Sequence, residues 1–263
     1  MDLGLTGKVV LVAASSKGLG KATAMAFARE GARVVICARN KEALAQAEDE
    51  IRRHYPTEVL ALDCDLTQVE EIKKLVEAVM DNFGRVDVLV NNAGGPAPGF
   101  FPDMGDEDWE QAYQLSLMSS VRLTREVLPV MLRQKYGRIV NITSVTVKQP
   151  IDQLLLSNSI RMGVIGWAKT LSNQVADKGI TINNVCPGWT RTGRVDSLLK
   201  SQADARGISV DEAEKAITEA IPMQRMGTPQ EFADLVVFLG SERAGYMTGT
   251  TIQIDGGMTV GYY

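Results

Sequence analysis

The chain has 263 residues, of which 45% are hydrophobic and 23% are charged, so it holds enough apolar material for one α/β domain around a large sheet. Its 28 basic and 32 acidic residues give a net charge of −4, which argues against nucleic acid as the main partner because that partner needs a basic face. No apolar run approaches the roughly 20 residues of a membrane span, and the amino-terminal residues lack a signal-peptide pattern. We expect a cytoplasmic protein with no membrane partner.

Short runs rich in valine and isoleucine alternate with longer amphipathic segments. The runs predict strands at Val9–Ala13, Arg33–Ala38, Val59–Leu62, Val86–Asn91, Arg138–Thr143, Thr181–Cys186 and Thr251–Asp255. The amphipathic segments predict helices at Leu19–Glu30, Lys41–His54, Gln68–Phe83, Asp106–Lys135, Gln153–Asp177 and Gln230–Leu239. The strands are apolar on both faces, as buried parallel strands are. The alternation predicts an α/β fold of the Rossmann type, a doubly wound parallel sheet of about seven strands between two helical layers, in a single domain over residues 1–263.

One polar and charged segment, between Trp189 and Pro222, breaks this alternation. It contains two weak helical patterns, Val195–Ala205 and Val210–Ala220. It also follows the carboxyl end of a predicted strand, where sheets of this kind bind ligands. We interpret residues 189–222 as a helical lid over the substrate, with a solvated helical excursion as the alternative.

Cysteine and histidine are too scarce to build a metal or nucleophile site. Cys37, Cys64 and Cys186 lie far apart, each at the end of an apolar run, and are expected to be buried free thiols in a reducing compartment. The only histidine, His54, ends a predicted helix, so a Ser–His–acid triad is not expected. No metal site is expected either.

The first predicted strand leads into a loop of small residues and then into a helix. Small residues let the backbone turn tightly and approach a pyrophosphate, while a helix amino terminus presents free N–H groups to it. The order strand, turn, helix favours a dinucleotide site, with an ordinary strand-to-helix turn as the alternative. We assign the phosphate end of a cofactor to Ser15, Ser16, Lys17, Gly18, Leu19 and Gly20.

The residue after the second strand decides between two cofactors. Sites selective for NAD usually place a carboxylate there for the ribose 2′-hydroxyl, but this sequence has Arg39. A guanidinium can bind a 2′-phosphate through charge-assisted hydrogen bonds, and Lys17 is a second cation able to reach it. The sequence therefore predicts NADP(H) in preference to NAD(H). After the third strand, Asp65 can accept a hydrogen bond from adenine or serve the next helix as a cap.

Further motifs follow in order along the chain: Asn91-Asn92-Ala93-Gly94, Pro187-Gly188, Pro222 to Pro229, Met247-Thr248-Gly249 and Asp255-Gly256-Gly257. With the glycine loop, they resemble the short-chain dehydrogenase/reductase family, in its branch similar to 3-oxoacyl-(acyl carrier protein) reductases, from about Thr6 to Gly257. The first glycine of the family's loop is Ala14 here. The resemblance implies cofactor contacts at Asp65, Leu66, Asn91, Ala93, Gly94, Pro187, Gly188 and Thr192. It also implies a homotetramer, or a homodimer, packed through the two long helices.

The family's catalytic positions are only partly filled. Its tyrosine exchanges a proton with the substrate oxygen, its lysine assists the tyrosine, its serine holds that oxygen, and its asparagine anchors a water. The resemblance places the serine at Ser144, the tyrosine at Ser157, the lysine at Arg161 and the asparagine at Ser116. Three of these four residues differ from the family pattern, and no tyrosine lies between residues 136 and 246 to supply one in another register.

These substitutions weaken proton transfer. A serine hydroxyl is a far weaker acid than a tyrosine beside a cation, and Arg161 can bind ribose hydroxyls or an anionic substrate group but cannot pass on a proton. We expect an NADP(H)-dependent oxidoreductase for a carbonyl or alcohol group of a small molecule, slowed by about 10²–10⁴-fold or more, with water or Lys148 exchanging the proton. The alternative is a catalytically inactive NADP(H)-binding sensor or assembly protein.

Overall fold

The fold is known from a computed structural model that describes residues 1–261, so the last two residues of the predicted domain lie outside the described residues. A single sheet of seven parallel strands has the order β3-β2-β1-β4-β5-β6-β7. The strands are β1 Val9–Val12, β2 Arg33–Ala38, β3 Val59–Asp63, β4 Val88–Asn91, β5 Gly137–Ile142, β6 Ile180–Pro187 and β7 Thr251–Ile254. The strand order reverses between β1 and β4, and sheets of this type bind ligands at the carboxyl ends of such strands.

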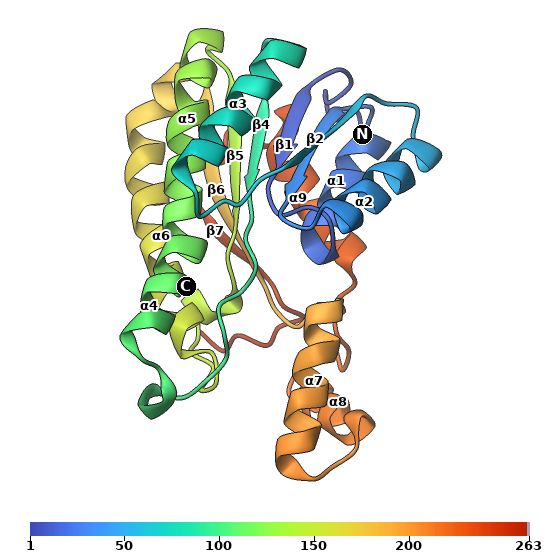
Figure 1. Ribbon diagram of the computed structural model, residues 1–263, viewed down its shortest axis with the longest axis vertical. Coiled ribbons are helices and arrows are strands. Elements are labelled where there is room, and N and C mark those ends of the chain that lie inside the picture. Colours follow the sequence, from blue (N-terminus) through green and yellow to red (C-terminus); the bar gives the residue numbers. More distant parts are fainter. Residues whose placement is uncertain (262–263) are drawn as a thin grey trace.

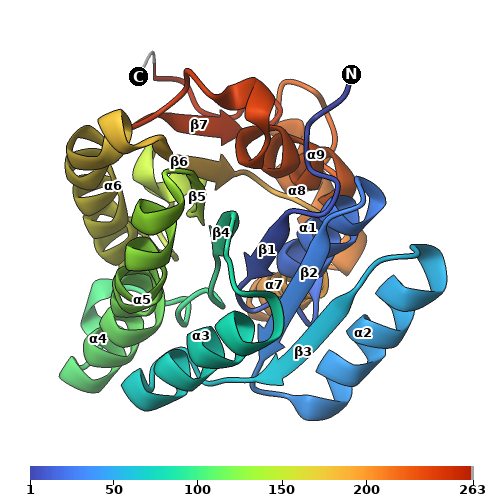
Figure 2. The ribbon, with the colours of Figure 1, turned by 90° about the horizontal axis from the view of Figure 1, so that it is seen from above.

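Helices cover both faces of this sheet, as Figure 1 and Figure 2 show. One face carries α1 Gly18–Arg29, α2 Lys41–His54 and α9 Pro229–Gly240. The other carries α3 Val69–Phe83, α5 Ser119–Gln134 and α6 Leu155–Val175. Alternate residues of each strand supply the two cores: Val10 and Val12 enter the first, and Val9 and Leu11 enter the second, as the two-residue period of a strand requires. The predicted Rossmann-type α/β fold is confirmed.

The long helix predicted over Asp106–Lys135 is not uniform. Helix α4 spans Asp106–Tyr113, a π-helical segment spans Gln114–Met118, and α5 begins at Ser119. A π-helical turn holds an extra residue, so it shifts the faces of the helix that follows. The segment turns Ser116 inward, where this residue is buried.

Two helices, α7 Gly193–Arg206 and α8 Val210–Glu219, follow β6 and project beyond the carboxyl ends of the strands (Figure 1). Both weak helical patterns of the sequence therefore form helices. The two helices pack together around a small apolar core of their own. It consists of Val195, Leu199 and Ala203 of α7, Ala213 of α8, and Met226, which follows α8. This separate core makes the segment a distinct helical unit beside the ends of the strands.

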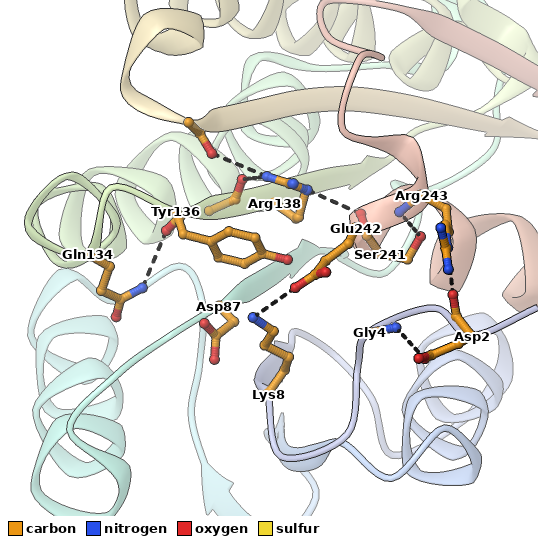
Figure 3. A network of polar contacts seen from close by, with 12 residues as sticks. Asp2, Gly4, Lys8, Asp87, Gln134, Tyr136, Arg138, Ser241, Glu242 and Arg243 are labelled. Atoms are coloured by element: carbon orange, nitrogen blue, oxygen red, sulfur yellow. Dashed lines mark hydrogen bonds and ion pairs between the residues drawn. The ribbon is translucent and has the colours of Figure 1, made fainter.

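A polar network fastens the opposite, amino-terminal edge of the sheet (Figure 3). The ring of Tyr136 lies between two cations, with Lys8 Nζ 4.3 Å and Arg138 Cζ 4.4 Å from its centroid. Lys8 Nζ lies 3.3 Å from a carboxylate oxygen of Glu242, and Arg138 Nε donates a 3.2 Å hydrogen bond to the carbonyl of Ser241. The network joins β1 and β5 to the segment before β7 at the edge away from the predicted site.

Within residues 1–261, no helix is long and apolar enough to cross a membrane. The three cysteines are free and buried, as the sequence predicts. Burial raises the pKa of Cys37 to about 11 and that of Cys64 to about 12, so both thiols stay protonated at neutral pH. They behave as core residues.

Candidate active site

A groove of about 820 Å³ runs along the carboxyl ends of the strands. Its wall holds residues that the sequence assigns to a cofactor site from five separate segments: the loop before α1, the end of β2, the end of β3, the segment after β4, and the residue before α7. The predicted cofactor residues that line the groove are Ser16, Lys17, Gly18, Leu19, Gly20, Arg39, Asp65, Leu66, Ala93, Gly94 and Thr192.

The loop before α1 is shaped by very close packing. A Cβ atom on Gly20 would lie 2.4 Å from the carbonyl oxygen of Ala14 and 2.8 Å from Nδ2 of Asn92. Asn92 Nδ2 donates to the carbonyls of Ala13 and Ala14 at 3.2 and 3.1 Å. The residue before α1, Lys17, makes no side-chain capping bond, so the first N–H groups of the helix remain available to an anion. This loop fits the pyrophosphate of a dinucleotide.

The far end of the groove is basic. Arg39 is 69% exposed and its Nη1 lies 3.9 Å from Asp65 Oδ2, a loose pairing that leaves most of its donors free. Asp65 Oδ1 accepts hydrogen bonds from the backbone N–H and the hydroxyl of Thr67 at 2.9 and 2.8 Å. Lys17 is exposed in the same groove. Two cations, Arg39 and Lys17, therefore line the groove, and each is able to bind a phosphate group.

Ser15 does not reach the groove, so the geometry does not support its assignment to the cofactor site. It is fully buried, its hydroxyl donates to the carbonyl of Val12 at 2.7 Å, and its oxygen accepts from the N–H of Cys37 at 3.1 Å. Both groups are used to tie β1 to β2. A loop sequence does not reveal which way each side chain points, and this one points into the sheet.

A ladder of amide side chains crosses the sheet beneath the site. Asn91 Nδ2 donates to Asn141 Oδ1 and to Thr124 Oγ1, both at 2.8 Å. Asn141 Nδ2 donates to Asn184 Oδ1 at 2.9 Å, and Asn184 Nδ2 donates to Thr251 Oγ1 at 3.1 Å. The ladder links β4, β5, β6 and β7. Asn91 therefore supports the sheet; it is not among the residues that line the groove, although the resemblance implies a cofactor contact there.

A second pocket, of about 180 Å³, adjoins the groove. Ser144, after β5, and Ser157, in α6, both line it. Thr146 connects them: its N–H donates to Ser144 Oγ at 3.2 Å, and its Oγ1 lies 3.0 Å from Ser157 Oγ. Neither Lys148 nor Asp152 is among the lining residues. The predicted nicotinamide-side residues Pro187, Gly188 and Thr192 line this pocket as well.

Arg161 is the buried cation of this pocket. It is 7% exposed, and its Nη1 donates to the carbonyls of Ile142 and Thr143 at 3.1 and 3.2 Å. No carboxylate of residues 1–261 lies within 4.0 Å of it. Burial, helped by the nearby charge of Arg194, lowers the pKa of Arg161 to about 10, so this residue is charged at neutral pH.

Ser116 lies near Arg161 across a small polar cavity of about 10 Å³. Asn91 also lines this cavity. Asn91 Oδ1, Ser116 Oγ and Arg161 Nε are all buried and have no hydrogen-bond partner among the described residues. One water molecule needs about 10–15 Å³ and two to four polar partners. The cavity therefore has the size and lining of a single-water site.

Sequence reasoning missed three residues here. Thr146 bridges the two serines, and a short 3₁₀ helix over Val145–Val147 positions it. Asn92 fixes the glycine loop. Arg194, at the start of α7, borders both the groove and the pocket. Only Asn92 lies in a motif recognised in the sequence.

The comparisons with known proteins agree with this architecture. A family model described as enoyl-(acyl carrier protein) reductase matches residues 13–259. The chain belongs to the short-chain dehydrogenase/reductase family. A relative named 3-oxoacyl-(acyl-carrier-protein) reductase, from Thermotoga maritima, is 34% identical over 256 residues, covering 97% of this chain and 99% of the relative.

Solved structures of reductases are similar over nearly the whole chain. One is the L-sorbose reductase of Gluconobacter frateurii complexed with NADPH and L-sorbose, with a TM-score of 0.95, 32% identity, and coverage of 99% of this chain and 100% of that one. Another is a variant of actinorhodin polyketide ketoreductase with NADPH, with a TM-score of 0.93, 36% identity, and coverage of 97% and 98%. The chain is thus an oxidoreductase-family member by both sequence and fold.

Proposed function

We propose that this protein is an NADP(H)-dependent oxidoreductase acting on the carbonyl or alcohol group of a small molecule, with substituted catalytic positions. The observation that carries the proposal is the shared border of the groove and the pocket, which Leu19, Asn92, Ala93 and Thr192 line from both sides. A dinucleotide that fills the groove would end at this border, next to a substrate held by Ser144 and Ser157. Residues 189–222 would act as the lid, since Val195 of α7 also lines the pocket.

The chain's own residues orient the substrate and leave its oxygen accessible to a proton donor. When bound, NADPH supplies the hydride for the carbonyl carbon and is oxidised to NADP⁺. Ser144 Oγ accepts the N–H of Thr146, which leaves the serine hydrogen free to donate to the substrate oxygen. Ser157, held by Thr146 Oγ1, flanks the same region. Because Lys148 does not line the pocket, water is the favoured source of the proton that the reduced oxygen takes up.

Arg161 and Ser116 complete the site in this proposal. Arg161 takes the place of the family's lysine and holds a ribose hydroxyl or an anionic group of the substrate. Ser116 takes the place of the asparagine and faces the cavity that also borders Arg161, where a single water would connect them. In this proposal neither Arg161 nor Ser116 donates the proton to the substrate oxygen.

The preference for NADP(H) rests on Arg39 and Lys17, and the sorbose reductase and actinorhodin reductase structures hold NADPH. Arg39→Ala should weaken NADPH binding by about 10-fold or more, since a hydrogen bond to a charged group is worth about 1.5–3 kcal/mol, while NADH binding changes little. Lys41→Ala removes a nearby exposed cation that pairs with Asp63 and serves as the control. Equal losses for both cofactors in fluorescence titrations would refute contact with a 2′-phosphate.

The activity test is oxidation of NADPH with a panel of ketones, ketoacyl thioesters, imines and enones. The proposal expects slow but measurable turnover with at least one class, because cofactor and alignment remain while the acid–base contribution of about 10²–10⁴-fold is lost. Turnover should fall further in Ser144→Ala. If no class oxidises NADPH although the cofactor binds tightly, the enzyme proposal is overturned.

A catalytically inactive NADP(H)-binding protein is the second candidate, and one observation favours it. No tyrosine of residues 1–261 lines the pocket, and Ser157 Oγ is engaged with Thr146. This candidate expects NADPH to raise the melting temperature without turnover. Replacing Ser157→Tyr together with Arg161→Lys should then create reductase activity that the native protein lacks. Native turnover above that of a protein-free control counts against it.

We also propose a cytoplasmic homotetramer, or homodimer, that assembles through the helices α4–α5 and α6. These helices expose large apolar side chains, including Tyr113, Leu132 and Met162, and burying exposed apolar surface favours association. The three free buried cysteines suit a reducing compartment. Sedimentation of the native chain and of Met162→Glu tests the assembly: loss of the native oligomer is the expected result, and a monomeric native chain refutes it.

A further inference from the structure

The 180 Å³ pocket has charge of only one sign. Its ionisable side chains are those of Arg161 and Arg194, and no aspartate or glutamate is among its lining residues. Several apolar side chains complete the wall, including Ile151, Leu154 and Leu198. A pocket whose only charged side chains are cations suits an organic anion better than an organic cation.

Burying the charge of Arg161 in this way carries a large desolvation cost. Its side chain is more than nine-tenths buried and has no carboxylate of residues 1–261 within 4.0 Å, whereas buried charges are ordinarily paired. The carbonyls of Ile142 and Thr143 take up Nη1, and Nε borders the small cavity with Ser116. Nη2 donates to no described residue and is not enclosed, so it is the part of the guanidinium left for a ligand.

Arg194 brings a second positive charge from another element. Its Nη1 and Nη2 donate to the carbonyls of Gly95 and Pro96 at 3.2 and 2.9 Å, which holds the side chain across the border between groove and pocket. A guanidinium has five N–H donors, so three remain after these two bonds. Arg194 is near enough to lower the pKa of Arg161, which means that the two charges repel each other until an anion binds.

We propose that this pocket recognises its substrate by a carboxylate group, held by Nη2 of Arg161 and by the guanidinium of Arg194. The proposal rests on the function proposed above and narrows its substrate class to oxo or hydroxy carboxylic acids. A planar carboxylate matches the donors of a guanidinium. Inorganic phosphate fits less well, because Ile151, Leu154 and Leu198 in the wall would contact only the apolar part of an organic acid.

The experiment compares matched acids and neutral esters on the protein loaded with NADP⁺. The probes are phenylpyruvate and levulinate, their methyl esters, and inorganic phosphate, each up to about 20 mM at constant ionic strength. Calorimetry and thermal shift measure binding. Each charge-assisted bond is worth roughly 10- to 100-fold in affinity, so at least one acid should bind 10-fold or more tightly than its ester.

The variants separate substrate from cofactor as the source of the anion. Arg194→Gln and Arg161→Lys should each lower the acid-to-ester ratio about 10-fold or more. Arg194→Gln should also leave NADP⁺ affinity within about threefold. Arg206→Gln removes the same charge from an exposed position of α7 and should change neither quantity. Arg161→Lys keeps the buried charge, so folding is preserved while the planar guanidinium and its Nη2 donor are lost.

Three results would overturn the proposal. The first is that acids and esters bind equally, or that neither binds. The second is that phosphate binds more tightly than every acid. The third is that Arg194→Gln weakens NADP⁺ binding while the acid-to-ester ratio is unchanged, which would assign this guanidinium to the cofactor. Acid binding is also measured on the cofactor-free protein, so it does not depend on the cofactor. Failure of the proposed function would instead appear as absence of NADP⁺ binding or of NADPH oxidation.

Discussion

Gly20 is the position where adding one methyl group should do the most damage. A Cβ there would lie 2.4 Å from the carbonyl oxygen of Ala14, 2.8 Å from Asn92 Nδ2 and 2.9 Å from Cα of Ser15. Two of these three atoms belong to the backbone and cannot turn away. Overpacking of this kind costs about 1–3 kcal/mol, and alanine recovers about 1 kcal/mol of helix propensity because Gly20 lies in α1. Gly20→Ala should therefore lower the free energy of unfolding by up to about 2 kcal/mol.

The same displacement should loosen the cofactor. Moving the start of α1 lengthens the hydrogen bonds that its N–H groups would donate to an anion. Loss of one such charge-assisted hydrogen bond, worth about 1.5–3 kcal/mol, weakens NADPH binding by roughly 10-fold or more. Urea unfolding and NADPH fluorescence titration measure the two effects. Gly105→Ala is the control, because a Cβ there meets only Asp108, at 3.9 Å, outside the groove. If Gly20→Ala matched this control in both measurements, the reasoning from close packing would be wrong.

Three further substitutions test individual features. Ala14 has a left-handed φ of 47°, which strains a residue that carries a Cβ. Ala14→Gly relieves this strain but gives the unfolded chain more entropy, so the free energy of unfolding should rise by about 0.5 kcal/mol. An unchanged or lower melting temperature would contradict this. The Tyr136 hydroxyl is buried without a partner among residues 1–261, so Tyr136→Phe should raise stability by about 1 kcal/mol, whereas a loss would reveal a hidden bond. The Arg225 guanidinium lowers the pKa of Glu231 to about 2. The unfolded chain therefore binds more protons than the folded chain below pH 5. Stability should fall between pH 5 and 2, and less steeply in Glu231→Gln; parallel pH curves would refute this.

The alternation of apolar runs and amphipathic segments was sufficient to predict the layers of the fold. It works because parallel strands are buried on both faces and helices on one. It fails at the π-helical segment, Gln114–Met118, because the predicted helix was treated as one regular helix and no residue type marks the extra residue of a π-helical turn. The first strand residue of β4 was placed two positions early, at Val86, since Val86 is as buried as the strand itself.

The cofactor end of the site was more predictable than the substrate end. Glycine and charge positions after each strand follow from what a dinucleotide needs, so Lys17, Arg39 and Gly20 were found from sequence. Sequence alone does not show that the Ser15 side chain points into the sheet, because side-chain direction in a loop depends on the backbone path. Arg194 was missed because it stands in a helical segment without a recognisable pattern, and only the fold brings it to the same pocket as Arg161.

The amide ladder under the site has a direction, and this direction matters to Arg161. Each asparagine donates toward β7, from Asn91 through Asn141 to Asn184, so the side-chain dipoles add along the row. The negative pole of the row is Asn91 Oδ1, which opens onto the same small cavity as Arg161 Nε. The partial negative charge at this end of the row therefore faces the cavity beside Arg161, a cation for which residues 1–261 offer no carboxylate within 4.0 Å, much as a helix terminus faces a bound ion.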